Sequence, residues 1–169
     1  MIILESERLI LRHQRLDDLE ALFALYADPD LRRYIPDAPT TLEETREELA
    51  WHQHGHATRP ELGLWATILK ADGTYLGRCG LLPWTLDGRE EVEVAFLIAK
   101  SHWGRGLATE AARAIRDYAF TTLGLQRLIC LIDPANRGSI RVAEKIGMTF
   151  ERAGEDEMGP FLIYAMARN

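Results

Sequence analysis

The chain has 169 residues, of which 47% are hydrophobic and 27% are charged. This balance is typical of a soluble globular protein with one buried core, and it excludes a disordered tail and a collagen-like rod. Twenty Lys and Arg residues against 26 Asp and Glu residues give a net charge of −6, which disfavours non-specific nucleic-acid binding and mildly favours cationic partners. No apolar run approaches the roughly 20 residues of a membrane span, and no secretion-signal pattern is found. We therefore expect a single domain over residues 1–169, a monomer or homodimer in the cytoplasm, with no nucleic-acid or membrane partner.

The two cysteines, Cys79 and Cys130, are too few for a disulfide scaffold. Each lies in an apolar, strand-like segment, which is typical of a buried thiol. We expect both to be reduced core residues in a reducing compartment.

The first half of the chain predicts one strand, two helices and a hairpin. Alternating apolar residues over 8–12 indicate a strand, and apolar residues at helical spacing over 19–26 indicate a helix that an Asp-Pro pair ends. A Thr-Leu-Glu-Glu capping box begins a second helix over about 41–55. The strand-like segments 63–70 and 74–84 flank an Asp-Gly turn, which predicts a β-hairpin.

The second half predicts a further turn at an Asp-Gly pair and then alternating strands and helices. The strands are expected at 91–99, 127–133, 148–153 and 161–167, and the helices at 106–123 and 139–146. The complete order is β-α-α-β-β-β-α-β-α-β-β. A three-stranded antiparallel meander joined to β-α-β units predicts an α/β (α+β) mixed sheet and not a doubly wound one.

The segment with the clearest chemical signal is Trp103-Gly104-Arg105-Gly106, where a strand runs directly into a helix. Glycine allows the backbone to approach a ligand closely, and the start of a helix presents unpaired N–H groups. Together these features predict an anion site, most simply for a phosphate or a pyrophosphate. No Walker-type loop is present, and Thr109 breaks the dinucleotide-binding pattern. On spacing alone, a tight turn without a ligand remains the alternative.

Three segments resemble the GNAT family of N-acetyltransferases. Residues 98–112, with Trp-Gly-Arg-Gly-Leu-Ala-Thr-Glu-Ala, resemble the family's acetyl-CoA pyrophosphate loop, and residues 133–150 resemble its next conserved block. Residues 7–12, Glu-Arg-Leu-Ile-Leu-Arg, resemble the branch that acetylates the N-termini of ribosomal proteins. The similarity covers about residues 5–167. It implies a central twisted, mostly antiparallel sheet that splays between the fourth and fifth predicted strands and is flanked by about four helices.

The resemblance also implies how acetyl-CoA is held. The pantetheine arm would lie in the splayed gap and bond to the backbone around Phe96, Leu97 and Ile98, with Asn136 bonding a pantetheine amide. The diphosphate would bind the backbone N–H groups of Trp103, Gly104, Arg105, Gly106, Leu107, Ala108 and Thr109. Many relatives carry Gln or Arg where this chain has Ser101, which bears on affinity.

Glu93 is our candidate for the general base, because it aligns with the Glu of a Glu-Ile-Gly-Tyr pattern in this branch. Glu91 shares a face of the strand with Glu93 and is an alternative base, and catalysis without a dedicated base is a third possibility. Many relatives protonate the leaving thiolate with a Tyr, but this chain has Ala143 there. Ser139 is therefore the candidate donor, with helix capping as the alternative role for both Ser139 and Asn136.

The implied activity is transfer of an acetyl group from acetyl-CoA to a primary amine. The preferred acceptor is the N-terminal amine of a protein or peptide, while polyamines, amino acids and aminoglycosides stay open. A non-catalytic acyl-CoA-binding module is the alternative from another class, because the usual Tyr is missing. Trp84 and residues 51–56 are candidates for lining the acceptor pocket. The three histidines within 52–56 do not match a zinc motif, so no metal site is expected.

Overall fold

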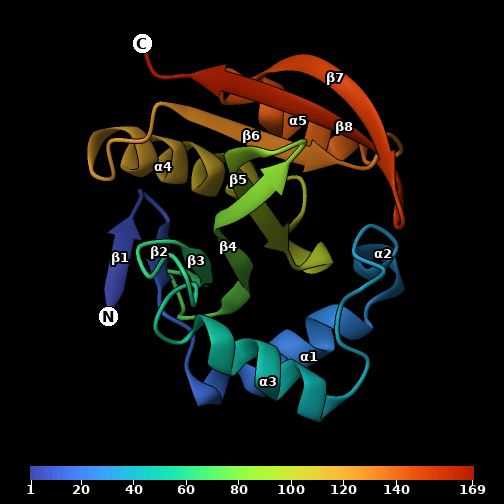
Figure 1. The fold of residues 1–169 in the computed structure, drawn as a ribbon. Helices are drawn as coiled ribbons and strands as arrows, with labels where there is room; N and C mark the ends of the chain where they lie inside the picture. The colour runs from blue at the N-terminus through green and yellow to red at the C-terminus, as the bar shows by residue number, and fades with distance from the viewer.

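A computed structural model describes all residues from 1 to 169 (Figure 1). The strands are β1 (Ile2–Glu5), β2 (Leu9–Arg12), β3 (Gly63–Leu69), β4 (Tyr75–Leu86), β5 (Arg89–Ile98), β6 (Arg127–Ile132), β7 (Thr149–Asp156) and β8 (Gly159–Ala167). The helices are α1 (Leu19–Ala27), α2 (Pro29–Arg32), α3 (Leu42–His52), α4 (Leu107–Thr121) and α5 (Arg137–Lys145). Short 3₁₀ turns, η1 (Leu16–Asp18) and η2 (Lys100–His102), precede α1 and follow β5. None of the helices is both long and apolar enough to cross a membrane.

The strands form one eight-stranded sheet in the order β1-β2-β3-β4-β5-β6-β8-β7. All neighbouring strands are antiparallel except β5 and β6, which confirms the predicted mixed sheet. Strands β4 and β5 pair at ten positions, from Gly77↔Ile98 to Leu86↔Arg89, whereas β5 and β6 pair only at Glu93↔Ile129. The edge of β5 that faces β6 therefore has no strand partner after Glu93, and the predicted splay lies there.

Helices cover both faces of the sheet. Leu107, Ala111 and Ile115 of α4 pack in the main core cluster with Cys79 and Val94 of the sheet. A second cluster joins α1 and α3, which lie side by side at the end of the molecule opposite β7 and β8 (Figure 1), to the other face. Since side chains alternate along a strand, Glu93 is on the α1–α3 face and Val94 is on the α4 face.

The structure confirms most of the predicted elements and adds two. Strand β1 was not predicted, because its sequence, Ile-Ile-Leu-Glu, does not alternate between apolar and polar residues. The segment forms a strand because it pairs with β2. Helix α2 was not predicted either: Pro29 ends α1 but takes the first position of a new short helix, where its missing N–H costs nothing. The helices thus number five instead of about four. Cys79 and Cys130 are both buried and unpaired, as predicted.

Candidate functional site

The turn between β5 and α4 is shaped by two glycines and one tryptophan. Gly104 and Gly106 have φ values of 76° and 74°, in the left-handed region that favours glycine. The indole Nε1 of Trp103 donates to the Ile98 carbonyl over 2.7 Å and ties the turn to the end of β5. The amide of Trp103 donates to the Lys100 carbonyl over 3.1 Å. Trp103 therefore does not offer a free N–H to a ligand, in contrast to the sequence-based expectation.

Six consecutive backbone amides after Trp103 are free. No N–H from Gly104 to Thr109 donates within the protein, and the first helical bond of α4 runs from the Glu110 amide to the Gly106 carbonyl. The turn is open, since a Cβ placed on Gly104 would meet no atom within 4 Å. Free amides at the positive end of a 15-residue helix form a cradle that fits the diphosphate of a coenzyme A molecule. Leu107, whose amide belongs to this set, is itself a buried core residue.

The free edge of β5 fits the extended arm of the same molecule. A side chain on Gly77 of β4 would clash with the Leu97 carbonyl, so the Leu97 backbone faces β4 and not the gap. The backbone groups of Phe96 and Ile98 point the other way, toward β6. The Ile98 carbonyl is already bonded to Trp103. Of the three residues expected to hold the arm, Phe96 and the Ile98 amide face the gap, and Leu97 does not.

Glu93 lies beside this gap with two hydrogen-bond donors. Trp84 Nε1 donates to Glu93 Oε2 over 2.7 Å, and the Leu131 amide of β6 donates to Oε1 over 3.4 Å. Burial raises the pKa of Glu93 to about 7, against the opposing effect of the Trp84 and Leu131 hydrogen bonds. A carboxyl group with a near-neutral pKa exchanges protons readily at physiological pH, which suits a general base.

Glu91, the alternative base, is engaged elsewhere. It is only 8% exposed and forms an ion pair with Arg127, whose Nε lies 3.0 Å from Glu91 Oε2. Arg127 also pairs with Glu151 over 2.7 Å. A carboxylate held in this way is a structural link between strands, and the geometry favours Glu93 over Glu91 as the base.

Helix α5 begins beside the same gap, directly after β6. Asn136 is its N-cap residue, and the side-chain Oδ1 accepts a hydrogen bond from the Ser139 amide over 3.2 Å. The side-chain oxygen of Asn136 thus serves in helix capping, the alternative role considered from the sequence. The hydroxyl of half-buried Ser139 forms no hydrogen bond and is free to donate to a ligand. Ala143 is completely buried in the core, so its position supplies no acid.

A cavity of about 200 Å³ is lined in part by Leu131, whose amide contacts the Glu93 carboxylate, while Glu93 itself is not part of the lining. The other lining residues come from the segment after α2, the end of β6 and the β7–β8 turn: Arg33, Tyr34, Pro36, Ile132, Asp133, Asp156, Met158, Gly159, Pro160 and Phe161. The cavity therefore combines two carboxylates and one guanidinium with several apolar side chains. We expected none of these residues from the sequence, because they meet only through the sheet order.

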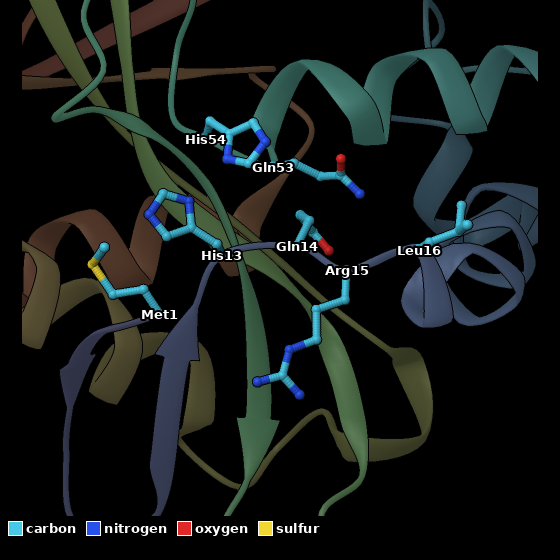
Figure 2. Close-up of a pocket in the computed structure, with 7 residues that line it drawn as sticks. All are labelled: Met1, His13, Gln14, Arg15, Leu16, Gln53 and His54. Carbon is cyan, nitrogen blue, oxygen red and sulfur yellow. The ribbon is translucent and has the colours of Figure 1, made fainter.

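A larger cavity, of about 490 Å³, lies away from these groups (Figure 2). Its lining comes from the start of the chain, the segment after β2 and the end of α3: Met1, His13, Gln14, Arg15, Leu16, Gln53 and His54. Figure 2 shows the rings of His13 and His54 beside this space, with Arg15 extending away from them. Burial lowers the pKa of His13, whereas Arg15 brings a permanent positive charge to the lining. The cavity includes Gln53 and His54 from the segment 51–56 that the sequence offered for the acceptor pocket, and none of the predicted catalytic or cofactor-binding residues.

The histidines at the end of α3 do not form a metal site. His52 is 8% exposed and accepts a hydrogen bond from the Leu64 amide over 3.4 Å. Burial lowers its pKa to about 4, so its ring is neutral at physiological pH. No group of three or more His, Cys, Asp or Glu side chains is arranged to hold a metal ion.

A splayed mixed sheet with an amide-lined turn beyond the gap is suited to a coenzyme A thioester, which points to an acyltransferase. Comparison with known proteins gives the same result. Residues 8–149 match the family model described as an acetyltransferase (GNAT) domain, and the chain belongs to the GNAT family. It is an N-acetyltransferase, like several curated relatives that carry that name.

Three relatives illustrate the range of similarity. The uncharacterized protein YkkB of Bacillus subtilis is 36% identical over 95% of this chain and 93% of its own. Spermidine N(1)-acetyltransferase of Escherichia coli is 29% identical over 94% of this chain and 81% of its own. The structure of RimL, a ribosomal L7/L12 alpha-N-protein acetyltransferase in complex with coenzyme A, superposes with a TM-score of 0.79. It covers 99% of this chain and 98% of its own, at 18% identity, which shows a shared fold.

Proposed function

We propose that the protein acetylates the N-terminal amine of a protein or peptide, with Glu93 as the general base. The observation that carries this proposal is the position of Glu93. Glu93 lies where the pairing of β5 with β6 ends, and its carboxyl group contacts the amide of Leu131, a residue that lines the 200 Å³ cavity. A base in this place removes a proton from an amine that enters the cavity and faces the gap.

The chain's own residues divide the remaining work. Acetyl-CoA supplies the acetyl group as a thioester. The amides from Gly104 to Thr109 hold its diphosphate, and the backbone of Phe96 and the amide of Ile98, which face β6, hold its arm. Arg105, exposed and beside these amides, adds positive charge. The free hydroxyl of Ser139 donates a hydrogen bond to the leaving sulfur, and the thiolate takes its proton from water.

The cavity supports an amine acceptor of limited size. Asp133 and Asp156 provide negative charge for a protonated amine, and Met158, Pro160 and Phe161 provide apolar contacts. Its volume of about 200 Å³ accommodates an amino terminus with one or two side chains, entering as an extended segment.

A small polyamine is the second candidate acceptor. The same two carboxylates suit a chain with several amino groups, and the spermidine acetyltransferase is similar over nearly the whole chain. A non-catalytic acyl-CoA-binding module is not retained, because the family and the named relatives are acetyltransferases.

Thiol release from acetyl-CoA with a panel of acceptors tests the proposal. The panel contains short peptides with free and with blocked N-termini, together with spermidine. We expect release with the free peptides that is lost on blocking, and a fall of about 10²–10⁴-fold in kcat for Glu93→Gln. Glu90→Gln is the matched control, since Glu90 is exposed on the same strand and bonds only to Thr85. Thiol release with spermidine but with none of the peptides would show that the acceptor is a polyamine and not a protein N-terminus. An unchanged kcat for Glu93→Gln would show that Glu93 is not the general base.

A further inference from the structure

Ser6, just before the Glu-Arg-Leu-Ile-Leu-Arg segment, and Arg8 within it contact the amide-lined turn and the first turn of α4, 97 to 104 residues away in sequence. Glu110, in the first turn of α4, accepts three hydrogen bonds from Ser6 and Arg8. Ser6 Oγ donates over 2.6 Å, the Arg8 amide over 2.7 Å, and Arg8 Nε over 2.6 Å as half of an ion pair. These bonds hold the turn between β1 and β2 against the start of α4.

Arg8 also reaches the backbone of the turn itself. Its Nη1 donates to the Arg105 carbonyl over 2.9 Å, and its Nη2 lies 3.7 Å from the place that a Cβ on Gly106 would occupy. Because Gly106 is left-handed, no helical N–H bonds to the Arg105 carbonyl, and Arg8 satisfies that oxygen instead. One guanidinium group thus bridges the Glu110 carboxylate and the peptide between the two glycines.

The charges explain why such a bridge matters for an anion site. Burial opposes ionisation of Glu110, but the hydrogen bonds from Ser6 and Arg8 outweigh it, so the pKa of Glu110 lies below its usual value. An ionised carboxylate in the first turn of α4 repels a diphosphate placed on the neighbouring amides. Arg8 neutralises that carboxylate through Nε and bonds the Arg105 carbonyl through Nη1. The second arginine of the segment, Arg12, has a different partner, Asp18, which it contacts through two bonds of 2.8 Å.

We propose that Arg8 and Glu110 are positioning residues for the anion-binding turn and set the protein's affinity for the diphosphate part of coenzyme A. This inference rests on the proposed place of the diphosphate at residues 104–109. The pair holds the Arg105 peptide so that the adjacent amides converge, and it cancels a carboxylate that otherwise opposes the ligand. Neither residue bonds to Glu93 or to its partners Trp84 and Leu131, so we expect the acetyl-transfer step itself not to depend on the pair.

Calorimetry with two ligands separates this role from a general structural one. Coenzyme A carries the diphosphate, and pantetheine carries the same arm and thiol without it. We expect Arg8→Met to weaken coenzyme A binding about tenfold or more, the scale of one lost charged hydrogen bond, and to leave pantetheine binding unchanged. Arg8→Lys keeps the charge but cannot form both contacts, so we expect a smaller loss.

A double variant and a control complete the test. Adding Glu110→Gln to Arg8→Met removes the uncompensated carboxylate, and we expect part of the lost coenzyme A affinity to return. Lys70→Met is the matched control, since Lys70 bonds Glu5 and the Ser6 carbonyl of the same β1–β2 region without touching the turn. We expect it to bind both ligands as the wild type does.

The outcomes distinguish the two proposals. If the wild-type protein binds coenzyme A no more tightly than pantetheine, the diphosphate site at the turn is wrong, and with it this inference. If the wild type prefers coenzyme A and both Arg8 variants keep that preference, only the positioning role is overturned. The same holds if Arg8→Met and Arg8→Lys weaken both ligands equally, because that result indicates a structural role alone.

Discussion

The hydrogen bond between Trp84 and Glu93 predicts a measurable shift in the pH dependence of acetyl transfer. The indole donates to the carboxylate over 2.7 Å, and this bond favours the ionised form that acts as base. Trp84→Phe removes the donor and keeps an aromatic ring. A hydrogen bond to a charged group contributes about 1.5–3 kcal/mol, and Trp84 is 41% exposed, so we take the lower end of that range.

The expected shift follows directly from this energy. Since 1.36 kcal/mol corresponds to one pKa unit, loss of the bond raises the pKa of Glu93 by about one unit, from about 7 to about 8. At pH 7 the ionised fraction of Glu93 then falls from about one half to about one tenth, and kcat falls about fivefold. At pH 9 the wild type and the variant approach the same kcat.

The assay is kcat for thiol release between pH 5.5 and 9 with both substrates saturating, so that the profile reports the complex. Trp51→Phe is the matched control, because Trp51 is 70% exposed on α3 and forms no hydrogen bond with Glu93. We expect its profile to overlay that of the wild type. The reasoning would be refuted if kcat fell on the acid side of the profile at the same pH in Trp84→Phe and in the wild type.

Three further predictions concern stability and the turn. The raised pKa of Glu93 means that ionisation opposes folding, so wild-type stability falls as pH rises from the ordinary value of 4.5 through about 7. In urea titrations, the free energy of unfolding of Glu93→Gln should therefore rise relative to that of the wild type by up to about 3 kcal/mol between pH 4 and pH 8. A difference between the two proteins that does not change with pH would contradict this prediction. Gly106→Ala should lower the free energy of unfolding by about 1 kcal/mol, because φ at this position is 74°, while the space for a Cβ is open. The same variant should weaken coenzyme A binding. An unchanged free energy of unfolding would count against a left-handed turn. Arg127→Met leaves the buried Glu91 carboxylate without its partner and should lower the free energy of unfolding by about 3 kcal/mol in the same titration. An unchanged urea midpoint would show that the ion pair does not stabilise the fold.

The strand-to-helix turn could be predicted from local sequence, because its shape depends on residues that are adjacent in the chain. Gly104 and Gly106 fix the left-handed conformations, and the apolar spacing after them fixes α4. The Thr41 capping box is equally local, and both of its bonds are present. The local pattern did not show that the Trp103 amide is already bonded, since that depends on the 3₁₀ turn before it.

The environment of the candidate base could not be predicted in the same way. The bond from Trp84 to Glu93 depends on the register between β4 and β5, and the pairing of Glu91 with Arg127 depends on β6 lying beside β5. Sequence spacing assigns a residue to a face of a strand but does not say which residue of another strand lies opposite. The contact of Arg8 with Glu110 was missed for the same reason, although both residues lie in segments that the sequence singled out.

The central claim is that the turn after β5 binds the diphosphate of coenzyme A. A crystal structure of the protein with coenzyme A tests it most directly. We expect phosphate oxygens within about 2.7–3.2 Å of amide nitrogens between Gly104 and Thr109, and the arm along β5. Coenzyme A bound elsewhere, for example in the cavity beside His13 and His54, with the six amides free of ligand, would contradict the account.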